Sequence, residues 1–204
     1  MAVIKSGATT DQLTIDPTSK AARVTLYDSA GSILCRQQTY NAGVTATASA
    51  AGTGVLANIV GSATKTVKVY RIRVNATVAT TVIIGTMLLA KRTVAGSGGT
   101  PVALTVTPTD SSNTAATATA NVYSALATAG TGGGVIDFQS KLIPLVSSTT
   151  FGMDCVYEFN CPAGIDGALQ PWVLRGVAQS LELSMLATTT NTPTFAVSAL
   201  WTEE

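Results

Sequence analysis

The stretch TVKVYRIRVNATV, residues 66–78, alternates apolar and polar side chains, as a half-buried β-strand does. Its apolar residues change parity part-way along. Val67 and Val69 are odd-numbered, whereas Ile72 and the apolar residues after it are even-numbered. Because successive side chains of a strand point to opposite faces, this change requires one additional residue within the strand. The stretch therefore predicts a long strand with a β-bulge near Tyr70 and Arg71.

Further strand-like runs lie on both sides of this stretch. TVIIGTMLLA, residues 81–90, is apolar on both faces and predicts a central strand. FGMDCVYEF, residues 151–159, has the strongest period-two pattern in the chain, with Glu158 on its polar face. The other predicted strands are 55–63, 101–107 with Val102, Leu104 and Val106 inward, 115–128, 135–145 ending at Pro144, 173–186 with a possible break at Gly176, and 194–201 with Phe195, Val197, Ala199 and Trp201 inward.

Turn-forming segments rich in Gly, Pro, Ser and Asn separate these runs, and no segment has a convincing helical period. Many short alternating strands at regular spacing are typical of antiparallel sandwiches. We therefore expect residues 55–204 to form an all-β domain, an antiparallel β-sandwich of the jelly-roll type.

The chain opens differently. Residues 9–31, TTDQLTIDPTSKAARVTLYDSAG, contain two short extended runs around the turn DPTSK. We interpret residues 1–36 as an extended N-terminal hairpin arm and residues 37–54 as a linker, or a loosely paired strand, that leads into the sandwich. Because an isolated hairpin is marginally stable in water, the arm must dock on its own chain or on another surface. The residues available for docking are Leu13, Ile15, Val24, Leu26 and Tyr27.

The composition favours a protein that makes large contacts. Hydrophobic residues form 46% of the 204 residues and charged residues only 11%, against roughly 25% charged in an average soluble domain. The longest apolar run, residues 82–90, is too short to span a bilayer, so we expect no membrane partner. The beginning of the chain has no apolar segment of the secretory type, which predicts an intracellular product. A net charge of +1 is far from the basic excess of nucleic-acid-binding proteins.

The charges are unevenly distributed along the chain. Residues 37–109 contain six basic residues and no acid, whereas residues 93–204 contain eight acidic residues and two basic ones. These charges can pair within one fold, or they can pair between neighbouring copies.

Several kinds of chemistry are excluded by the lack of histidine. His-based acid–base catalysis, Ser–His triads and the usual zinc sites all need that side chain. The carboxylates that remain as candidates are Asp137, Asp154, Glu158, Asp166 and Glu182. Asp154 and Glu158 lie about 13 Å apart along a strand, beyond the separation of glycosidase pairs, which favours a solvated face. We predict no catalytic residue, no cofactor site and no metal site.

Two glycine-rich runs, AGSGGT at residues 95–100 and AGTGGG at residues 129–134, superficially resemble phosphate-binding loops. Neither ends in Lys-Ser or Lys-Thr, and neither is followed by a helical pattern. We interpret both as turns.

Cysteine and tryptophan residues give weaker signals. Cys35, Cys155 and Cys161 form no CxxC motif, and we expect free, buried thiols. Trp201 faces the core by its alternation. Trp172 follows a long loop and is either buried, in the core or at a subunit contact, or exposed as a sugar-stacking ring.

Five segments together resemble a group of tailed-bacteriophage virion proteins. They are SGATTDQLTIDPTSKAARVTLYDSAG (6–31), YRIRV (70–74), LLAKRTVAGSGGTPVALTVTPTDSSNTAATATANVYSA (88–125), WVLRGVAQSLEL (172–183) and ALWTEE (199–204). They cover 87 of the 204 residues. The resemblance implies an oligomeric structural component of the virion, assembled in the cytoplasm of the bacterial host, with a β-sandwich domain. It also implies that residues 1–36 add their strands to another virion protein.

Three functions remain in competition. The first is a capsid decoration, or cement, protein that clusters as a homotrimer and binds the major capsid protein, or another virion protein, through its arm. The alternative is a tail or head-fibre adaptor, or receptor-binding module. The third is an enzyme such as a glycan hydrolase, which the missing catalytic constellation disfavours.

Overall fold

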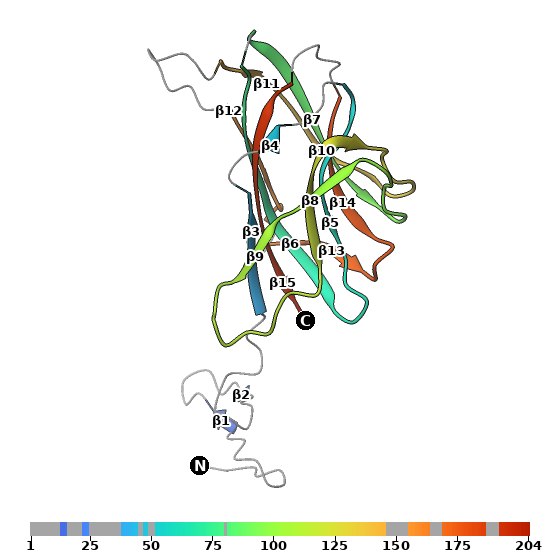
Figure 1. Cartoon of the computed structure of the whole chain (residues 1–204). Coiled ribbons are helices and arrows are strands. Elements are labelled where there is room, and N and C mark those ends of the chain that lie inside the picture. Colours follow the sequence, from blue (N-terminus) through green and yellow to red (C-terminus); the bar gives the residue numbers. More distant parts are fainter. Residues whose placement is uncertain are drawn as a thin grey trace. The chain divides into compact units, whose positions relative to one another are not determined.

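The structure, a computed structural model, describes residues 13–15, 22–24, 38–44, 47–48, 52–79, 81–145, 155–163, 169–186 and 192–204. Within these residues every regular element is a β-strand and none is a helix (Figure 1). The chain divides into two units, Met1–Gln37 and Gln38–Glu204. The prediction of an all-β protein is confirmed.

The described residues of the first unit form one pair of short strands. β1 (Leu13–Ile15) and β2 (Ala22–Val24) pair antiparallel, with Leu13 opposite Val24 and Ile15 opposite Ala22. The register places the two extended runs of the sequence side by side, as a hairpin requires.

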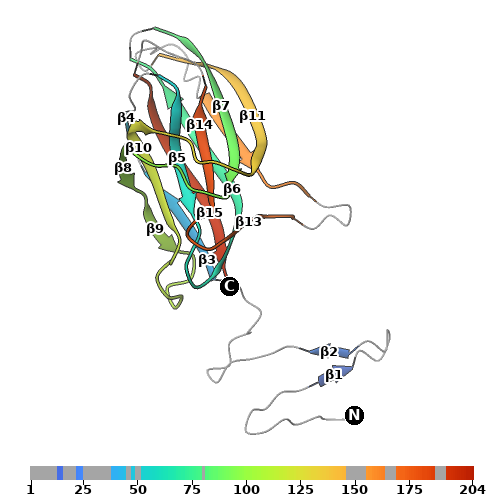
Figure 2. The same cartoon turned by 90° about the vertical axis from the view of Figure 1, so that its right-hand side faces the viewer.

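The second unit is built from two antiparallel sheets (Figures 1 and 2). In the first, called the β7 sheet, the strand order is β11 (Gly134–Ile143), β7 (Ile83–Arg92), β14 (Ser180–Met185), β5 (Gly54–Val60), β10 (Thr119–Ala127) and β8 (Thr100–Ala103). In the second, called the β6 sheet, the order is β12 (Cys155–Asn160), β6 (Thr66–Thr77), β15 (Thr194–Glu203), β3 (Gln38–Gly43) and β9 (Thr105–Pro108). β13 (Trp172–Arg175) also pairs with β6, and β4 (Thr47–Ala48) pairs with β15.

The predicted bulge in β6 is confirmed. On β15, Leu200 lies opposite Arg71, and the next residue, Trp201, lies opposite Val69, so that Tyr70 is the additional residue. The carbonyl of Tyr70 accepts a hydrogen bond from the backbone of Cys161 at 2.8 Å. The bulge also divides the other edge of β6, because β13 pairs before Tyr70 and β12 pairs after it.

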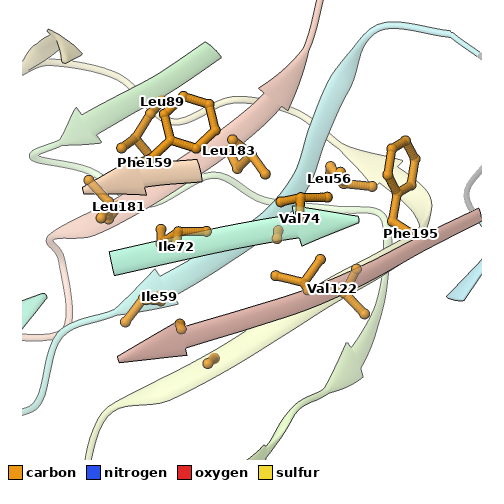
Figure 3. Packing of buried hydrophobic residues seen from close by; sticks show 14 of the residues in the cluster. Leu56, Ile59, Ile72, Val74, Leu89, Val122, Phe159, Leu181, Leu183 and Phe195 are labelled. Atoms are coloured by element: carbon orange, nitrogen blue, oxygen red, sulfur yellow. The ribbon is translucent and has the colours of Figure 1, made fainter. Parts of the chain in front are cut away.

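The core lies between the inner faces of the two sheets. Figure 3 shows Leu181 and Leu183 of β14 with Ile72 and Val74 of β6, all fully or almost fully buried. Each such side chain stabilises the fold by about 1.5–3 kcal/mol relative to exposure. The inward positions predicted for β15 are confirmed, since Phe195, Val197, Ala199 and Trp201 are all buried.

For residues 37–54 the sequence left a linker or a loosely paired strand open, and residues 38–43 are a strand. They form β3, which lies inside the β6 sheet between β15 and β9. The physical reason is Tyr40, which is fully buried and stacks on Trp201 with ring centroids 6.0 Å apart. Burial of this one aromatic ring among small residues stabilises the strand. Because a single ring cannot show a period of two, the sequence of residues 38–43 does not reveal the strand.

The predicted strand 101–107 is wrong as a single element. It is two strands, β8 in the β7 sheet and β9 in the β6 sheet, with Leu104 between them. Leu104 points into the core, but Val102 is 37% exposed and Val106 is half-buried. The predicted break at Gly176 is confirmed. Gly176 has a φ of 77° and separates β13 from β14, which lie in different sheets.

Candidate functional site

Two glycine-rich connections lie over β14 on the outer face of the β7 sheet. We call residues 93–99 and 128–133 together the glycine flap. Its two halves are joined by isolated bridges between Val94 and Thr131 and between Ser97 and Thr128. Both lie in connections between strands, as predicted. As a result β14 is buried on both of its faces.

The flap is bonded to a buried carboxylate, that of Glu182. Oε1 of Glu182 accepts the backbone N–H of Gly96 at 2.7 Å and the hydroxyl of Ser180 at 2.9 Å. Oε2 accepts the backbone N–H of Gly130 at 2.9 Å. The loops that resemble phosphate-binding loops thus do bind an anion, but the anion is a side chain of the same protein.

Arg92 supplies the charge that Glu182 needs. Its Nε lies 3.6 Å from Oε2 of Glu182, and the glutamate side chain is fully buried. Two further pairs, Lys65 with Glu203 at 3.7 Å and Lys68 with Glu204 at 2.6 Å, join the basic and acidic parts of the sequence. Pairing within one fold, the first of the two predicted possibilities, therefore holds for these charges.

A second buried carboxylate, that of Glu203, lies at the end of β15 in the β6 sheet. Its oxygens accept the backbone N–H groups of Thr117 and Ala118, the Thr117 hydroxyl at 2.7 Å and the indole N–H of Trp201 at 3.1 Å. Burial by itself would raise the pKa of Glu203. The hydrogen bonds from Ala118, Thr117 and Trp201 outweigh that effect and lower the pKa below its ordinary value.

Glu182 and Glu203 each hold backbone N–H groups of connecting segments through hydrogen bonds. Of the other candidates, Asp137 and Glu158 are exposed, while Asp154 and Asp166 lie outside the described residues. Across the described part of the chain, no group of three metal-ligating side chains is found.

The predictions for sulfur and indole groups have mixed outcomes. Cys155 and Cys161 are free and buried, as predicted, and burial raises the pKa of both thiols. Cys35 lies outside the described residues. Trp201 is buried, and Trp172 is half-buried against the core, which agrees with the core alternative for that ring.

Side chains close the gap between the edge strands β11 and β12. Lys141 donates to the carbonyl of Val156, and Nε2 of Gln139 donates to the carbonyl of Glu158 at 2.8 Å. The Lys141 ammonium also lies 5.5 Å from the centre of the Tyr157 ring. Unpaired edge carbonyls are a template for unwanted strand pairing, so these bonds protect β12.

The outer face of β7 and β11 carries exposed apolar side chains. Ile84 lies directly opposite Leu142, and Leu88 lies opposite Phe138. Ile84, Phe138 and Leu142 are 65%, 66% and 57% exposed. Between the two pairs the hydroxyls of Thr86 and Ser140 lie 2.8 Å apart. We call Ile84, Leu88, Phe138 and Leu142 the apolar strip.

The sequence prediction did not single out the apolar strip. Residues 81–90, apolar on both faces, predict a central strand, and β7 does lie between β11 and β14. The outer face at Ile84 is nevertheless exposed, because the glycine flap bonds farther along the sheet, at Glu182. Apolar residues on both faces of residues 81–90 were the feature of the sequence that could have indicated this exposed surface.

The residues predicted to dock on a partner are placed only in part. Leu13 and Ile15 lie in β1, and Val24 lies in β2. Leu26 and Tyr27 lie outside the described residues. Docking by these five residues stays a prediction.

Comparisons with protein-family models, with curated proteins and with solved structures find no match to this chain. The described residues include no helix with the length and hydropathy of a membrane span.

Proposed function

We propose that this protein is a structural component of a tailed-phage virion, and specifically a capsid decoration protein. The proposal draws on the resemblance of five sequence segments to virion proteins and on the chemistry of the fold. The two buried carboxylates are used to hold loops against sheets.

The single observation that carries the proposal is the apolar strip. Exposed single apolar side chains are ordinary, but contiguous ones on a sheet face mark an interaction surface. Here two directly opposed pairs, Ile84 with Leu142 and Leu88 with Phe138, lie on one face of two strands, on either side of the Thr86–Ser140 pair, and Leu88 is half-buried. Such a face suits a protein that works by contact with neighbours.

We assign two contacts to two regions of the chain. The apolar strip packs against neighbouring copies, as a homotrimer. Residues 1–36 bind the major capsid protein by adding β-structure to it, with Leu13, Ile15, Val24, Leu26 and Tyr27 as the apolar anchors. Main-chain hydrogen bonds give affinity in this mode, and alternate side chains give specificity. Many copies on one shell then add avidity.

The finer description of the fold that we propose is the jelly-roll type. In its support, the chain passes repeatedly between the two sheets, and the late strand β14 lies between the early strands β5 and β7. Insertion of a late strand between early ones is what Greek-key connections produce. The strands β8 and β9, which extend opposite sheets, are additions to that pattern.

Copy number per particle tests the proposed location. Quantitative mass spectrometry of purified virions, referenced to the major capsid protein, is expected to find hundreds of copies. A few copies to a few dozen contradict decoration and favour a tail or fibre adaptor. If the protein hydrolysed glycans, and substitution of a single Asp or Glu abolished that hydrolysis, a structural role would be contradicted altogether.

A further inference from the structure

Several edge strands of the sandwich are obstructed against pairing with a further strand. On β8, the N–H of Leu104 bonds to β10, so the backbone of Pro101 faces away from the sheet. On β9, the N–H of Thr109 bonds to β3, so the backbone of Pro108 faces away in the same manner. Proline offers no N–H to an incoming strand. On β12, carbonyls at the edge are already bonded by side chains of β11.

β11 lies at the opposite margin of the β7 sheet from β8 and is the longest described edge strand, with 10 residues (Figure 2). The bond from the N–H of Leu186 to the carbonyl of Thr86 shows that even-numbered residues of β7 bond to β14. Odd-numbered residues of β7 therefore bond to β11, where they lie opposite odd-numbered residues. The backbones of Ser140 and Leu142 consequently face away from the sheet, and within the described part of the chain no hydrogen bond reaches their N–H and C=O groups.

The N–H of Phe138 faces the same way, but it already has a partner. Oδ1 of Asp137 accepts it at 2.8 Å. The open groups of this edge are therefore the N–H groups of Ser140 and Leu142 and the carbonyls of Phe138, Ser140 and Leu142. A long exposed edge with open main-chain groups is a template for pairing with another strand.

A second copy of the chain fits this edge in an antiparallel register centred on Ser140. The two Ser140 residues then exchange N–H···O=C bonds, and the N–H of each Leu142 bonds to the carbonyl of the other copy's Phe138. Each open N–H meets an open carbonyl, and Asp137 keeps its own bond. A register centred on Gln139 would instead require the N–H of Phe138, which Asp137 occupies.

The side chains of the outer face match in the register centred on Ser140. Phe138 lies opposite the other copy's Leu142, so that apolar side chains meet apolar ones. The two Ser140 hydroxyls meet between these pairs, in line with the Thr86 hydroxyl that each already contacts at 2.8 Å. The apolar strips of the two copies therefore join into one surface across the shared edge.

The charges of the inner face favour the same register. Each Lys141 lies opposite the other copy's Gln139 and diagonal to its Asp137, a carboxylate of opposite sign. The hydrogen bond to the carbonyl of Val156 anchors each ammonium group to β12 of its own copy. A register centred on Lys141 would set two ammonium groups directly opposite each other, which is destabilising. Hydrogen bonding and charge thus select the same partner, a second copy of this chain.

We propose that two copies of the protein pair antiparallel through β11, about a two-fold axis at Ser140, so that their β7 sheets become one continuous sheet. This contact differs from the proposed homotrimer, because it uses the edge of β11, joins copies of different trimers and leaves the outer face of the apolar strip to the trimer. A contact of a few main-chain bonds is weak, so it forms at high local concentration, as on a crowded surface. It does not depend on residues 1–36.

Disulfide trapping in the full chain tests this contact. In Ser140→Cys the two Cα atoms should lie about 5.5 Å apart, within the range of about 4.4–6.8 Å that disulfides span. Mild oxidation at about 1 mM chain should give at least about tenfold more covalent dimer than Val177→Cys, which places a thiol at an exposed position outside β11. Because the chain has three cysteines of its own, mass spectrometry of the digested dimer must identify the link between the two residues 140.

Two further variants test the register. Phe138→Cys alone should not cross-link, because the two residues 138 lie about 13 Å apart along the paired strands. An equimolar mixture of Phe138→Cys and Leu142→Cys should cross-link, because these residues lie opposite each other. Adding Ser140→Pro to both members of the mixture removes the N–H at the axis and should reduce the mixed link at least about tenfold. The unfolding midpoint of Ser140→Pro should stay close to that of the natural protein, because within the described part of the chain this N–H has no partner to lose.

The pairing is overturned if Ser140→Cys gives no link between residues 140. It is also overturned if Phe138→Cys alone cross-links as well as the mixture does, or if Ser140→Pro leaves the mixed link undiminished. A homotrimer without these links would contradict the edge contact and leave the proposed function in place. The links in a protein present in only a few copies per particle would contradict decoration and support the edge contact.

Discussion

Oε1 of Glu182 accepts the backbone N–H of Gly96 at 2.7 Å, although 86 residues separate them. This bond, with its counterpart from Gly130, attaches the glycine flap to the central strand of the β7 sheet. Gly96 must be glycine, because a Cβ there would lie 2.3 Å from the carbonyl oxygen of Thr128 and 3.0 Å from Oε1 of Glu182.

Gly96→Ala should therefore destabilise the fold by about 3 kcal/mol, through overpacking and the loss of a charge-assisted hydrogen bond. Urea unfolding followed by tryptophan fluorescence measures the change. Gly134→Ala is the matched control, since a Cβ there meets nothing within 4 Å. Equal stability of the two variants would show that the flap does not depend on Glu182.

Glu182→Gln keeps the shape of the side chain and removes its charge. The positive charge of Arg92 then loses its counter-ion in a buried place, which is expected to cost about 3 kcal/mol. Glu158→Gln on the exposed face of β12 should change the unfolding free energy by less than about 0.5 kcal/mol. The thermal and urea unfolding midpoints of both variants are compared with those of the natural protein. A Glu182→Gln variant as stable as the natural protein would refute a stabilising role of the ion pair.

Stability should fall in acid because of Glu203. The folded-state pKa of this carboxyl is lowered, so the unfolded chain binds its proton more readily. The resulting stabilisation is complete above the ordinary pKa of 4.5 and is lost as the pH falls through the lower, folded-state pKa. Urea midpoints between about pH 7 and about pH 2.5 should show this loss, and Glu203→Gln should flatten the curve in the acid range. If the urea midpoint of Glu203→Gln fell in acid as steeply as that of the natural protein, Glu203 would be excluded as the source of the loss.

The apolar strip should determine association but not folding. Phe138→Lys together with Leu142→Lys places two charges on a solvent-exposed edge strand, where they favour the monomer. Sedimentation equilibrium should give three times the 20.7 kDa chain mass for the natural protein and a monomer for the double variant. The unfolding midpoint should stay nearly constant.

The control for this experiment is Val177→Lys, an exposed apolar residue away from the strip. It should leave the oligomer intact. A natural protein that is monomeric at every concentration would contradict the role given to the strip.

Local periodicity was enough to predict much of the fold. The change of parity in residues 66–78 located the bulge at Tyr70, and the alternation in residues 194–201 located four core residues. These features follow from the two-residue period of a strand, which acts between neighbours. The break at Gly176 was visible for the same reason, since it interrupts a local pattern.

Features that depend on distant residues were not predicted. The role of Glu182 rests on donors 52 and 86 residues away, in runs whose sequence indicates only turns. The division of residues 101–107 between two sheets is a tertiary choice, made at Leu104, within a pattern that fits one strand equally well. β3 depends on the contact of Tyr40 with Trp201, residues at opposite ends of the sandwich sequence.

The most direct test of the proposed function is co-sedimentation with phage heads stripped of this protein. The full chain should sediment with the heads at saturation. The chain lacking residues 1–36 should keep a cooperative unfolding transition, because residues 38–204 form a separate unit, and should stay in the supernatant. Sedimentation of the shortened chain with undiminished affinity would contradict docking through residues 1–36.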